Sequence, residues 1–394
     1  MTGNILILQS GISSVVGNAT LYGLLTEALN YEDVEEIYGV FNGFEGLQKE
    51  NFIDLAALPQ QSAKALLYTS GFALKTESSN FYQNECDFNK MVQNLKNRDI
   101  HYIACICDQN ALKYAQELSQ AAESIDYNLN VLAIPQSNTN ELPITDHSLG
   151  YGSYLKYVAN YLRELEQNVR TSSSRLGICE IIAGNNGWVT AGTALNINNG
   201  KNKQLNDNPF IVALPEQPLN EQQLADLVTE KMNTYGYVCI VVNHTLFNQD
   251  GETIDLNAFG GSSAYYLGEI IYNKLNIESQ IYTCDMKSQV LSHFISEQDQ
   301  KEAVACGREA IKALLQDQES NKAIVVLRKD SEHYDFEVKV IDWNEVIDGT
   351  KFLPSDWIQD NMWINYSFTK YAQPLIQGEV PVHFEKGLAQ LAHL

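Results

Sequence analysis

Short apolar segments alternate along the chain with longer segments whose apolar residues recur at helical spacing. Residues 4–8 and 102–107 are apolar at successive positions, as strands buried on both faces of a parallel sheet are. Residues 15–29 place apolar side chains three and four positions apart, which predicts an amphipathic helix. The same patterns predict further strands at 35–41, 64–68, 130–135 (ending at a proline), 176–182, 210–214, 237–242 and 280–284, and further helices at 81–95, 111–118, 188–195, 221–232, 262–275 and 300–315.

This strand–helix alternation predicts an α/β protein with mostly parallel sheets. Only 323–327 and 336–341 follow one another as strands, which predicts a hairpin. A chain of 394 residues is long enough for two or three domains, or for one large two-lobed unit.

Composition narrows the class of partner. Hydrophobic residues make up 44% and charged residues 19%, as in globular proteins, and the formal net charge is -23. So acidic a chain repels a phosphate backbone, so no nucleic-acid partner is expected. No apolar run approaches the roughly 20 residues that cross a bilayer, and no secretion signal opens the chain. With seven widely spaced cysteines, we expect reduced thiols in the cytoplasm.

In α/β folds, ligands bind at the edge where the strands' carboxyl ends lie. The residues that follow the predicted strands are polar, rich in Gly and Asn, and poor in Lys and Arg. Ordinary turn chemistry explains each single loop equally well. Cys105 and Cys107, with Cys284 or His147, could bind a metal, although buried free thiols explain these cysteines too. His244 and His293 are candidate acid–base groups or ordinary hydrogen-bonded histidines.

Several of these loops carry a family resemblance. The segments are Leu142-Pro-Ile-Thr-Asp146, Gly150-Tyr-Gly-Ser153, Gly187-Trp188, Pro215-Glu216 and 371–379 (Tyr-Ala-Gln-Pro-Leu-Ile-Gln-Gly-Glu). In this order they resemble the phosphofructokinase family, and the pyrophosphate-dependent branch most closely. The resemblance implies two Rossmann-like three-layer lobes. It assigns 1–143, completed by about 278–320, to a lobe for the phosphoryl donor, 144–277 to a sugar-phosphate lobe, and 321–394 to a C-terminal hairpin and tail that pack back on both.

The donor side departs from the family pattern. The resemblance aligns the family's loop Gly-Gly-Asn/Gly-Asp-Ser with 107–111, so Cys107 and Asp108 replace the two glycines, Gln109 stands at the Asn/Gly position, and Asn110 replaces the aspartate that serves Mg²⁺. A neutral amide binds Mg²⁺ poorly, so no metal is expected. Gly11 and Gly71 belong to the other two loops on this side, and in the second of these loops Phe72 and Lys75 stand at the other two glycines of the family's Gly-Gly-x-x-Gly-Ser pattern.

The catalytic loop departs as well. The family's Pro-Lys-Thr-(Ile/Val)-Asp-Asn-Asp aligns with 135–141, which places Gln136 at the pyrophosphate-binding lysine and Thr139 at the catalytic base. A threonine hydroxyl does not accept a proton near neutral pH. Asn140 and Glu141 are the nearest remnants, and losing a positioned base removes a factor of about 10²–10⁴ in rate.

On the sugar-phosphate side, arginines of the family become neutral residues. Gly184 stands at the arginine of Met-Gly-Arg, His244 in the family's Ser-Glu-Gly, and Gln289 at the arginine of a Gln-Arg pair. Replacing arginine gives up a bidentate charged clamp. Positions that resemble substrate-binding ones are Ser137, Arg175, Gly184, Glu216, His244 and Gln289, and the family arginine at 175 reaches across a subunit interface.

Retained scaffold with altered chemistry predicts a catalytically inactive member, acting as a regulatory or partner subunit or as a sensor of a small phosphorylated metabolite. No cofactor is expected. The first alternative is an active enzyme that uses Mg²⁺, either a diphosphate- or ATP-dependent fructose-6-phosphate 1-phosphotransferase or a divergent sugar-phosphate kinase. The second alternative is a structural or interaction protein whose ligand site is empty. Expected partners are further copies of the chain, in a dimer or tetramer, or an active paralogue.

Overall fold

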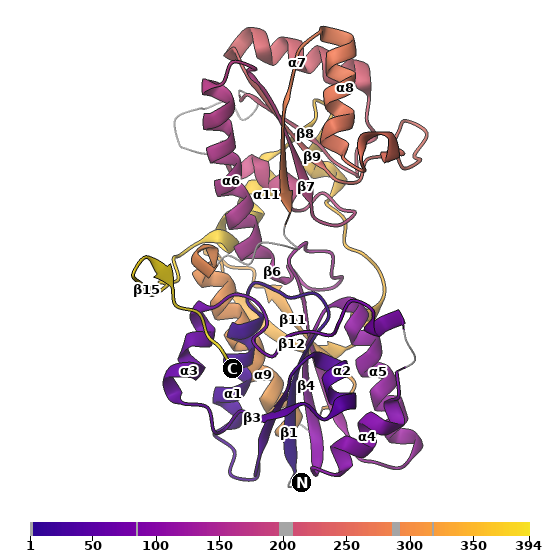
Figure 1. Cartoon of the computed structure of the whole chain (residues 1–394), viewed down its shortest axis with the longest axis vertical. Helices are drawn as coiled ribbons and strands as arrows, with labels where there is room; N and C mark the ends of the chain where they lie inside the picture. The colour runs from indigo at the N-terminus through magenta and orange to yellow at the C-terminus, as the bar shows by residue number, and fades with distance from the viewer. Residues whose placement is uncertain (1–2, 84–85, 197–207, 286–291, 317–318) are drawn as a thin grey trace.

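The structure, a computed structural model, describes residues 3–83, 86–196, 208–285, 292–316 and 319–394. It has two lobes, one above the other along the long axis, and each lobe is built around one sheet (Figure 1). This is the predicted α/β architecture with two lobes and mostly parallel sheets.

The larger sheet has eight strands within the described residues, in the order β12-β11-β5-β4-β1-β2-β3, with β6 beside β5. Its inner strands run parallel, while β3 and β12 are antiparallel to their neighbours. The bounds are β1 (Asn4–Ser10), β2 (Ile37–Val40), β3 (Phe52–Asp54), β4 (Ile100–Cys107), β5 (Asn130–Ser137), β6 (Leu149–Gly150), β11 (Lys322–Arg328) and β12 (Phe336–Asp342).

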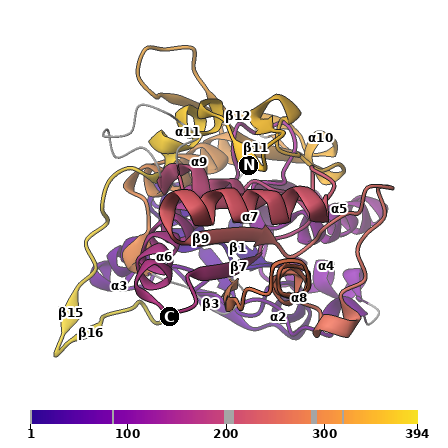
Figure 2. The same ribbon diagram turned by 90° about the horizontal axis from the view of Figure 1, so that it is seen from above.

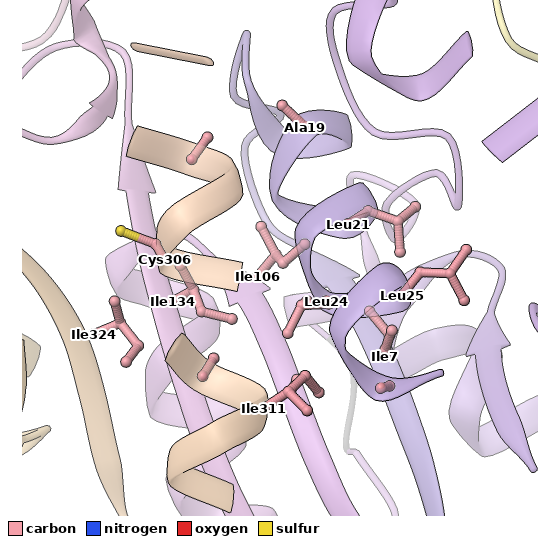
Figure 3. Close-up of a cluster of buried hydrophobic side chains, with 14 of the residues drawn as sticks. Ile7, Ala19, Leu21, Leu24, Leu25, Ile106, Ile134, Cys306, Ile311 and Ile324 are labelled. Atoms are coloured by element: carbon pink, nitrogen blue, oxygen red, sulfur yellow. The ribbon is translucent and has the colours of Figure 1, made fainter. Parts of the chain in front are cut away.

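Helices cover both faces of this sheet, which explains the continuous apolar runs. Ile7 points to the face under α1 and α9 (Figure 3). Ile5 packs in the same cluster, whereas Leu6 and Leu8 point to the face under α2, α4, α5 and α10. These helices are α1 (Gly17–Ala28), α9 (Glu297–Leu315), α2 (Gly43–Lys49), α4 (Phe88–Lys96), α5 (Gln109–Ser124) and α10 (Asn344–Ile347).

Helices α1 and α9 are far apart in sequence but touch closely. A side chain at Gly23 would place its Cβ 2.4 Å from the carbonyl oxygen of Val304, and one at Gly307 would lie 2.4 Å from that of Thr20. Glycine at both positions therefore lets the backbones meet. This contact holds the late segment 297–315 against the first helix of the chain.

The smaller sheet has the strand order β10-β7-β9-β8 and is parallel throughout. Helices α6 and α11 and the 3₁₀ helix η3 cover one face, and α7 and α8 cover the other. Figure 2 looks down on this lobe, with α7 and α8 nearest the viewer. The bounds are β7 (Leu176–Ile182), β8 (Phe210–Ala213), β9 (Val238–Asn243), β10 (Gln280–Asp285), α6 (Tyr151–Thr171), α7 (Glu221–Tyr235), α8 (Ser263–Leu275), α11 (Tyr366–Ala372) and η3 (Thr190–Asn196).

Helix α6 connects the lobes, and the apolar pattern did not predict it. No side chain of its own caps its first turn. Instead, the buried carboxylate of Asp299 from α9 accepts hydrogen bonds from the amides of Gly150 (2.9 Å) and Ser153 (2.8 Å) and from the Ser153 hydroxyl (2.6 Å). An acceptor from another element therefore satisfies the donors at the start of α6.

Four predicted elements differ. The helix predicted at 81–95 begins only at Phe88, in α4, and Phe81–Gln83 forms a separate 3₁₀ turn. Residues 64–68 are helical, at the end of α3 (Gln60–Ala65) and in η1 (Leu66–Tyr68), because the strand beside β2 comes earlier, at β3. Strand β5 does not end at Pro135 but continues to Ser137. Its pairing with β11 ends at Ala133, so the missing amide of Pro135 leaves no gap in that ladder. The helix at 188–195 is a 3₁₀ helix, η3.

The chain crosses between the lobes more than once. Strand β10 lies in the smaller sheet, although 278–320 was expected in the donor lobe, and α9 packs on the larger sheet. The predicted hairpin β11–β12 forms and extends the larger sheet, while 353–376 packs on the smaller lobe. Remaining elements are β13 (Ile358–Gln359), β14 (Trp363–Ile364), the projecting hairpin β15 (Phe384–Glu385) and β16 (Leu388–Ala389), and 3₁₀ turns η2 (Phe81–Gln83), η4 (Asn257–Phe259), η5 (Ser292–Phe294), η6 (Ser355–Trp357) and η7 (Gln373–Ile376). Among the described helices, none is long and apolar enough to span a bilayer.

Candidate functional site

The loop after β1 lies against two carboxylates of the protein itself. Glu77 accepts hydrogen bonds from the hydroxyl of Ser10 (2.5 Å) and the amides of Gly11 (3.1 Å) and Phe44 (2.7 Å). Asp108 accepts from the amide of Ile12 (2.8 Å). Backbone amides grouped at a loop in this way are the usual donors for a bound anion. Here the anions are side chains of the same chain.

Gly11 is the residue that allows this arrangement. Its φ of 81° lies in the left-handed region, and a Cβ would come within 2.4 Å of the Asp108 carboxyl carbon. The Asp108 side chain also caps α5 by accepting from the amide of Ala111 (2.7 Å). Burial raises the pKa of Asp108, and the nearby carboxylate of Glu141 raises it further, against the hydrogen bonds that lower it.

The neighbours of Asp108 do not form a metal site. The side-chain Nε2 of Gln109 donates to the carbonyl oxygens of Val346 and Gly349, both at 2.9 Å, and so binds the C-terminal part of the chain. Asn110 is exposed on the first turn of α5. Within the described ranges, no group of three or more His, Cys, Asp or Glu side chains could hold a metal ion. Because Asp108 is committed to two amides and Asn110 is uncharged, these residues do not fit Mg²⁺.

The loop after β5 closes on itself through Glu141. The Glu141 carboxylate accepts hydrogen bonds from the hydroxyls of Ser137 (2.6 Å) and Thr139. The Ser137 hydroxyl also accepts from the amide of Thr139 (3.1 Å). The position that resembles the family's base therefore holds a hydroxyl that donates to a carboxylate.

Gln136 is buried at 1% exposure and points toward α1. Its amide nitrogen donates to the Thr20 hydroxyl at 2.6 Å, while its amide oxygen is buried without a partner among the described residues. A buried, unpaired carbonyl oxygen is costly. The position that resembles a pyrophosphate-binding lysine thus faces the packing between β5 and α1.

Asn140 anchors the other end of this loop, in the left-handed region at a φ of 61°. Its side-chain oxygen accepts from the Ser148 amide (2.9 Å) and from the ammonium of Lys351 (3.0 Å), and its nitrogen donates to the Tyr371 hydroxyl (3.1 Å). Lys351 also donates to the carbonyl oxygens of Thr145 and Asp146, at 3.1 and 2.9 Å. Burial lowers the pKa of Lys351 to about 7. The Lys351 ammonium thus holds the side chain of Asn140 and the backbone at residues 145 and 146.

A charged network beneath the loop was not predicted from sequence. Buried His147 bonds Asp146 Oδ2 at 3.0 Å through Nδ1 and Glu302 Oε2 at 2.7 Å through Nε2. Arg328 donates to the same oxygen of Asp146 at 3.1 Å. Burial opposes the charge of His147, but Glu302 and Asp146 outweigh it and raise its pKa to about 9. The Tyr334 hydroxyl donates to Glu302, which completes a link among the 146 loop, α9 and the β11–β12 hairpin.

The smaller lobe faces this loop through Gly184. Gly184 has a φ of 68°, and a Cβ there would lie 3.7 Å from the Thr139 hydroxyl, in ordinary contact. The structure thus brings together two predicted positions from different lobes. Glu216 lies nearby in the smaller lobe and accepts from the amides of Gly187 (2.8 Å) and Leu353 (3.2 Å). Burial raises the pKa of Glu216.

His244 follows β9 and has a partner that the sequence did not reveal. Its Nδ1 lies 2.9 Å from Glu180 Oε1, on β7. Glu180 is 3% exposed and also accepts from the Ser262 hydroxyl (2.6 Å) and from the amide (3.1 Å) and hydroxyl (3.2 Å) of Ser263, at the start of α8. A signal was available, because Glu180 lies near the end of β7 and His244 directly follows the neighbouring strand β9, but spacing alone does not select the pair.

Of the remaining predicted residues, Arg175 lies away from this group, whereas Gly71 lies beside the segment that follows β1. Arg175 precedes β7, at the opposite edge of the smaller sheet from Gly184, and its guanidinium donates to the carbonyl oxygen of Arg170 at 2.7 Å. Gly71, at a φ of 97°, donates to the carbonyl oxygen of Val15 at 3.4 Å, beside the start of α1. Gln289 lies outside the described residues.

Comparison with known proteins gives a consistent result. The sequence profile of the family described as phosphofructokinase matches residues 4–327. The pyrophosphate–fructose 6-phosphate 1-phosphotransferase of Halomonas elongata is 27% identical, covering 99% of this chain and 96% of its own, and that of Methylococcus capsulatus is 26% identical, covering 95% and 92%. The crystal structure of a pyrophosphate-dependent phosphofructokinase from Marinobacter aquaeolei superposes with a TM-score of 0.87 at 24% identity, covering 99% of this chain and 95% of that one.

Proposed function

The chain belongs to the phosphofructokinase family, and we propose that it is a member that transfers no phosphoryl group and acts as a regulatory or partner subunit, or as a sensor of a small metabolite. The relatives from Halomonas elongata and Methylococcus capsulatus are named as pyrophosphate–fructose 6-phosphate 1-phosphotransferases. This chain keeps their length and fold. The family resemblance places the difference in the chemistry at the edge where the two lobes meet.

One observation carries the proposal. The amides of Gly11 and Ile12, in the loop after β1, donate to the carboxylates of Glu77 and Asp108. Glu141 stands close enough to Asp108 to raise the pKa of that carboxyl. Pyrophosphate or a nucleoside triphosphate bound at this edge would meet negative side chains, where it needs free hydrogen-bond donors and cations.

Two further features support the same conclusion. Thr139 places a hydroxyl, already donating to Glu141, where a base is needed to take a proton from a sugar. Gly184 offers no side chain to grip a phosphate, and Lys351 is held by Asn140 and two carbonyl oxygens. The residues at 139 and 184 are uncharged, and the ammonium of Lys351 is engaged by the protein itself, so neither position offers a free cation to a phosphate.

The decisive experiment is a turnover assay with fructose 6-phosphate and Mg²⁺, run with pyrophosphate and separately with ATP, and in the reverse direction with fructose 1,6-bisphosphate. The Halomonas elongata relative serves as the positive control. We expect no conversion above the rate without protein. Sustained Mg²⁺-dependent conversion by the purified chain would overturn the proposal.

An active transferase is the second candidate, because the similarity to named phosphotransferases covers nearly the whole chain. If the assay is positive, replacing Glu141 with Gln tests whether that carboxylate has taken over as base. A strong fall in kcat with little change in KM would support that role.

The partner is inferred to be either further copies of this chain, as a dimer or tetramer, or an active paralogue. Size-exclusion chromatography with light scattering, alone and after mixing with a pyrophosphate-dependent relative from the same cell, separates the two. All seven cysteines are free thiols, which agrees with the proposed cytoplasmic location. The sensor role predicts that a small metabolite raises the unfolding temperature.

A further inference from the structure

We propose that the outer edge of β12 is an interface through which two copies of this chain associate, each β12 pairing antiparallel with the other about a two-fold axis at Val338. The inference rests on the part of the proposed function that names further copies of the chain as partners. The surface lies on the larger lobe, at the last strand of its sheet.

Strand β12 has one side without a neighbour. β11 pairs with the other side over all seven residues and without a register shift, and no described strand pairs with the outer side. Each residue of β12 keeps some exposure, whereas Ala323 to Val326 of β11 are buried. A regular strand without proline offers its unpaired amides and carbonyl groups to a further strand.

Two hydrogen bonds beyond the ends of β12 show which of its residues face β11. The amide of Lys329 donates to the carbonyl oxygen of Asp335 at 3.0 Å. At the other end, the amide of Trp343 donates to the carbonyl oxygen of Asn321 at 3.5 Å. In an antiparallel pair, every second residue bonds to the neighbouring strand, and the residues between them turn their backbone groups the other way. The odd-numbered residues of β12 therefore bond to β11, and the even-numbered ones direct their backbone groups outward.

Three of these outward residues are apolar. They are Phe336, Val338 and Val340, whose side chains pack against the core cluster under α9. The amide of Phe336 donates to the exposed carboxylate of Asp335 at 2.9 Å. Among the described residues, the amides of Val338 and Val340 have no hydrogen-bond partner. A second strand would supply the carbonyl oxygens that these amides lack.

The outward residues are arranged symmetrically about Val338. A second copy must place outward residues opposite outward residues, because these have the free backbone groups. With the axis at Val338, this residue exchanges two hydrogen bonds with its own copy across the axis. Phe336 then lies opposite Val340 of the second copy, and the reverse pair forms on the other side of the axis. These apolar pairs extend the surface under α9 across the interface.

The charges on the other face of β12 select this register. Glu337 and Lys339 lie on that face, with Oε1 and Nζ 2.7 Å apart and with 42% and 51% of their side chains exposed. With the axis at Val338, each glutamate lies opposite the lysine of the second copy, which gives two attractive pairs. An axis one residue later would also match the outward backbone groups, but it would place Lys339 opposite Lys339 of the second copy. Like charges directly opposite one another are unfavourable.

The net charge of the hairpin also suits contact between two copies. The whole chain carries a formal charge of -23, but residues 322–342 contain four basic and five acidic side chains. Two such edges meet with little net repulsion, although two whole chains repel one another. Because one strand from each copy makes a small interface, we expect weak association that depends on protein concentration.

This contact differs from the one that the family resemblance implies at Arg175. Arg175 precedes β7 in the smaller lobe, whereas β12 belongs to the larger sheet. Two different two-fold contacts in one chain give a tetramer, and the β12 contact alone gives a dimer. In both cases, loss of the β12 contact halves the mass of the assembly.

The test measures the mass of the full chain by light scattering and sedimentation, from about 1 to about 200 µM. Glu337→Lys and Lys339→Glu each turn both attractive pairs into repulsive ones, and each should weaken self-association at least about tenfold. Mixing these two variants again places opposite charges across the axis, so the mixture should assemble where neither variant does alone. The double variant, Glu337→Lys with Lys339→Glu, should assemble as well.

Two further variants separate strand pairing from general charge effects. Glu332→Lys makes the same charge change in the exposed turn before β12 and should leave the mass unchanged. Val338→Pro removes the outward amide at the axis, where no bond to β11 is lost, and should abolish the contact. Hydrogen exchange at the amides of Val338 and Val340 should slow as the concentration of the unchanged chain rises. Unfolding temperatures are measured alongside, and the charge variants, at partly exposed side chains, decide the test if Val338→Pro unfolds.

Three outcomes overturn the inference. One is the mass of a single chain at about 200 µM. Another is an assembly whose mass is the same in Glu337→Lys and Lys339→Glu as in the unchanged chain. The third is a mixture of these two variants that stays unassembled. Turnover is assayed on the same preparation: conversion of fructose 6-phosphate refutes the proposed lack of catalysis alone, whereas a mixture that fails to assemble refutes only this interface.

Discussion

Removing the carboxylate of Glu77 should leave three hydrogen-bond donors, in the loop after β1 and at the start of α2, without their acceptor. In Glu77→Ala, the Ser10 hydroxyl and the amides of Gly11 and Phe44 lose partners that now lie at 2.5, 3.1 and 2.7 Å. Gly43 packs against the same carboxylate, since a Cβ there would lie 2.0 Å from Glu77 Oε1. The variant therefore opens space as well as freeing donors.

The magnitude follows from the geometry. A buried hydrogen bond to a charged group contributes about 1.5–3 kcal/mol, and three such bonds would sum well above the effect expected here. Glu77 is only partly buried, so water can replace part of what is lost. We expect the free energy of unfolding to fall by about 2–3 kcal/mol. At about 2 °C per kcal/mol for a chain of this size, the unfolding temperature falls by roughly 5 °C.

The assay combines urea denaturation with thermal unfolding in the presence and absence of pyrophosphate. Glu77→Gln keeps one acceptor oxygen and should lose about half as much stability. Glu32→Ala, at an exposed site, is the matched control and should have no effect. Because the freed donors suit an anion, pyrophosphate should raise the unfolding temperature of Glu77→Ala but not of the unchanged protein.

The reasoning fails if Glu77→Ala unfolds at the temperature of the unchanged protein. It also fails if pyrophosphate stabilises the unchanged protein as strongly as the variant. In either case the Glu77 carboxylate does not accept these hydrogen bonds in solution, and the proposed function loses the observation on which it rests.

Three other predictions concern neighbouring contacts. Asp299→Ala should lower the free energy of unfolding by about 3 kcal/mol, because the first turn of α6 loses its acceptor, with the urea midpoint as readout and Asp299→Asn as the milder variant. The pKa of His147 is raised to about 9 in the folded state, so its protonation stabilises the fold fully below about pH 6.5, and this stabilisation is lost as the pH rises through 9. The urea midpoint should show this pH dependence, and His147→Gln should lack it. Gln136→Lys, which restores the family residue, should destabilise the protein and give no turnover in the coupled assay, because the charge would be buried beside Thr20, whereas Gln136→Met should change stability by less than about 1 kcal/mol.

Local patterns predicted most of the framework correctly. The doubly apolar runs at β1 and β4 require helices on both faces of the sheet, and both faces are covered. Prediction failed where context decides the outcome. Helix α6 depends on Asp299, almost 150 positions later in the chain, and Pro135 is accommodated because β11 pairs only as far as Ala133.

The candidate site was predictable as a set of strand ends, because parallel strands place their carboxyl ends along one edge. That reasoning, with the family resemblance, identified Asp108, Thr139, Gly184 and His244. It missed Glu77, Glu180 and Lys351, whose roles depend on contacts with segments far away in sequence.

The sequence by itself determined the alternation of strands and helices, the family and the scarcity of cations in the loops, because each of these depends on residue type and local spacing. Only the tertiary structure decided which acceptor each donor finds. Glu77 reaches Gly11 across 66 positions, and Glu180 reaches His244 across 64. A carboxylate satisfies any donor within about 3 Å, and that proximity arises only when the sheets and helices have packed.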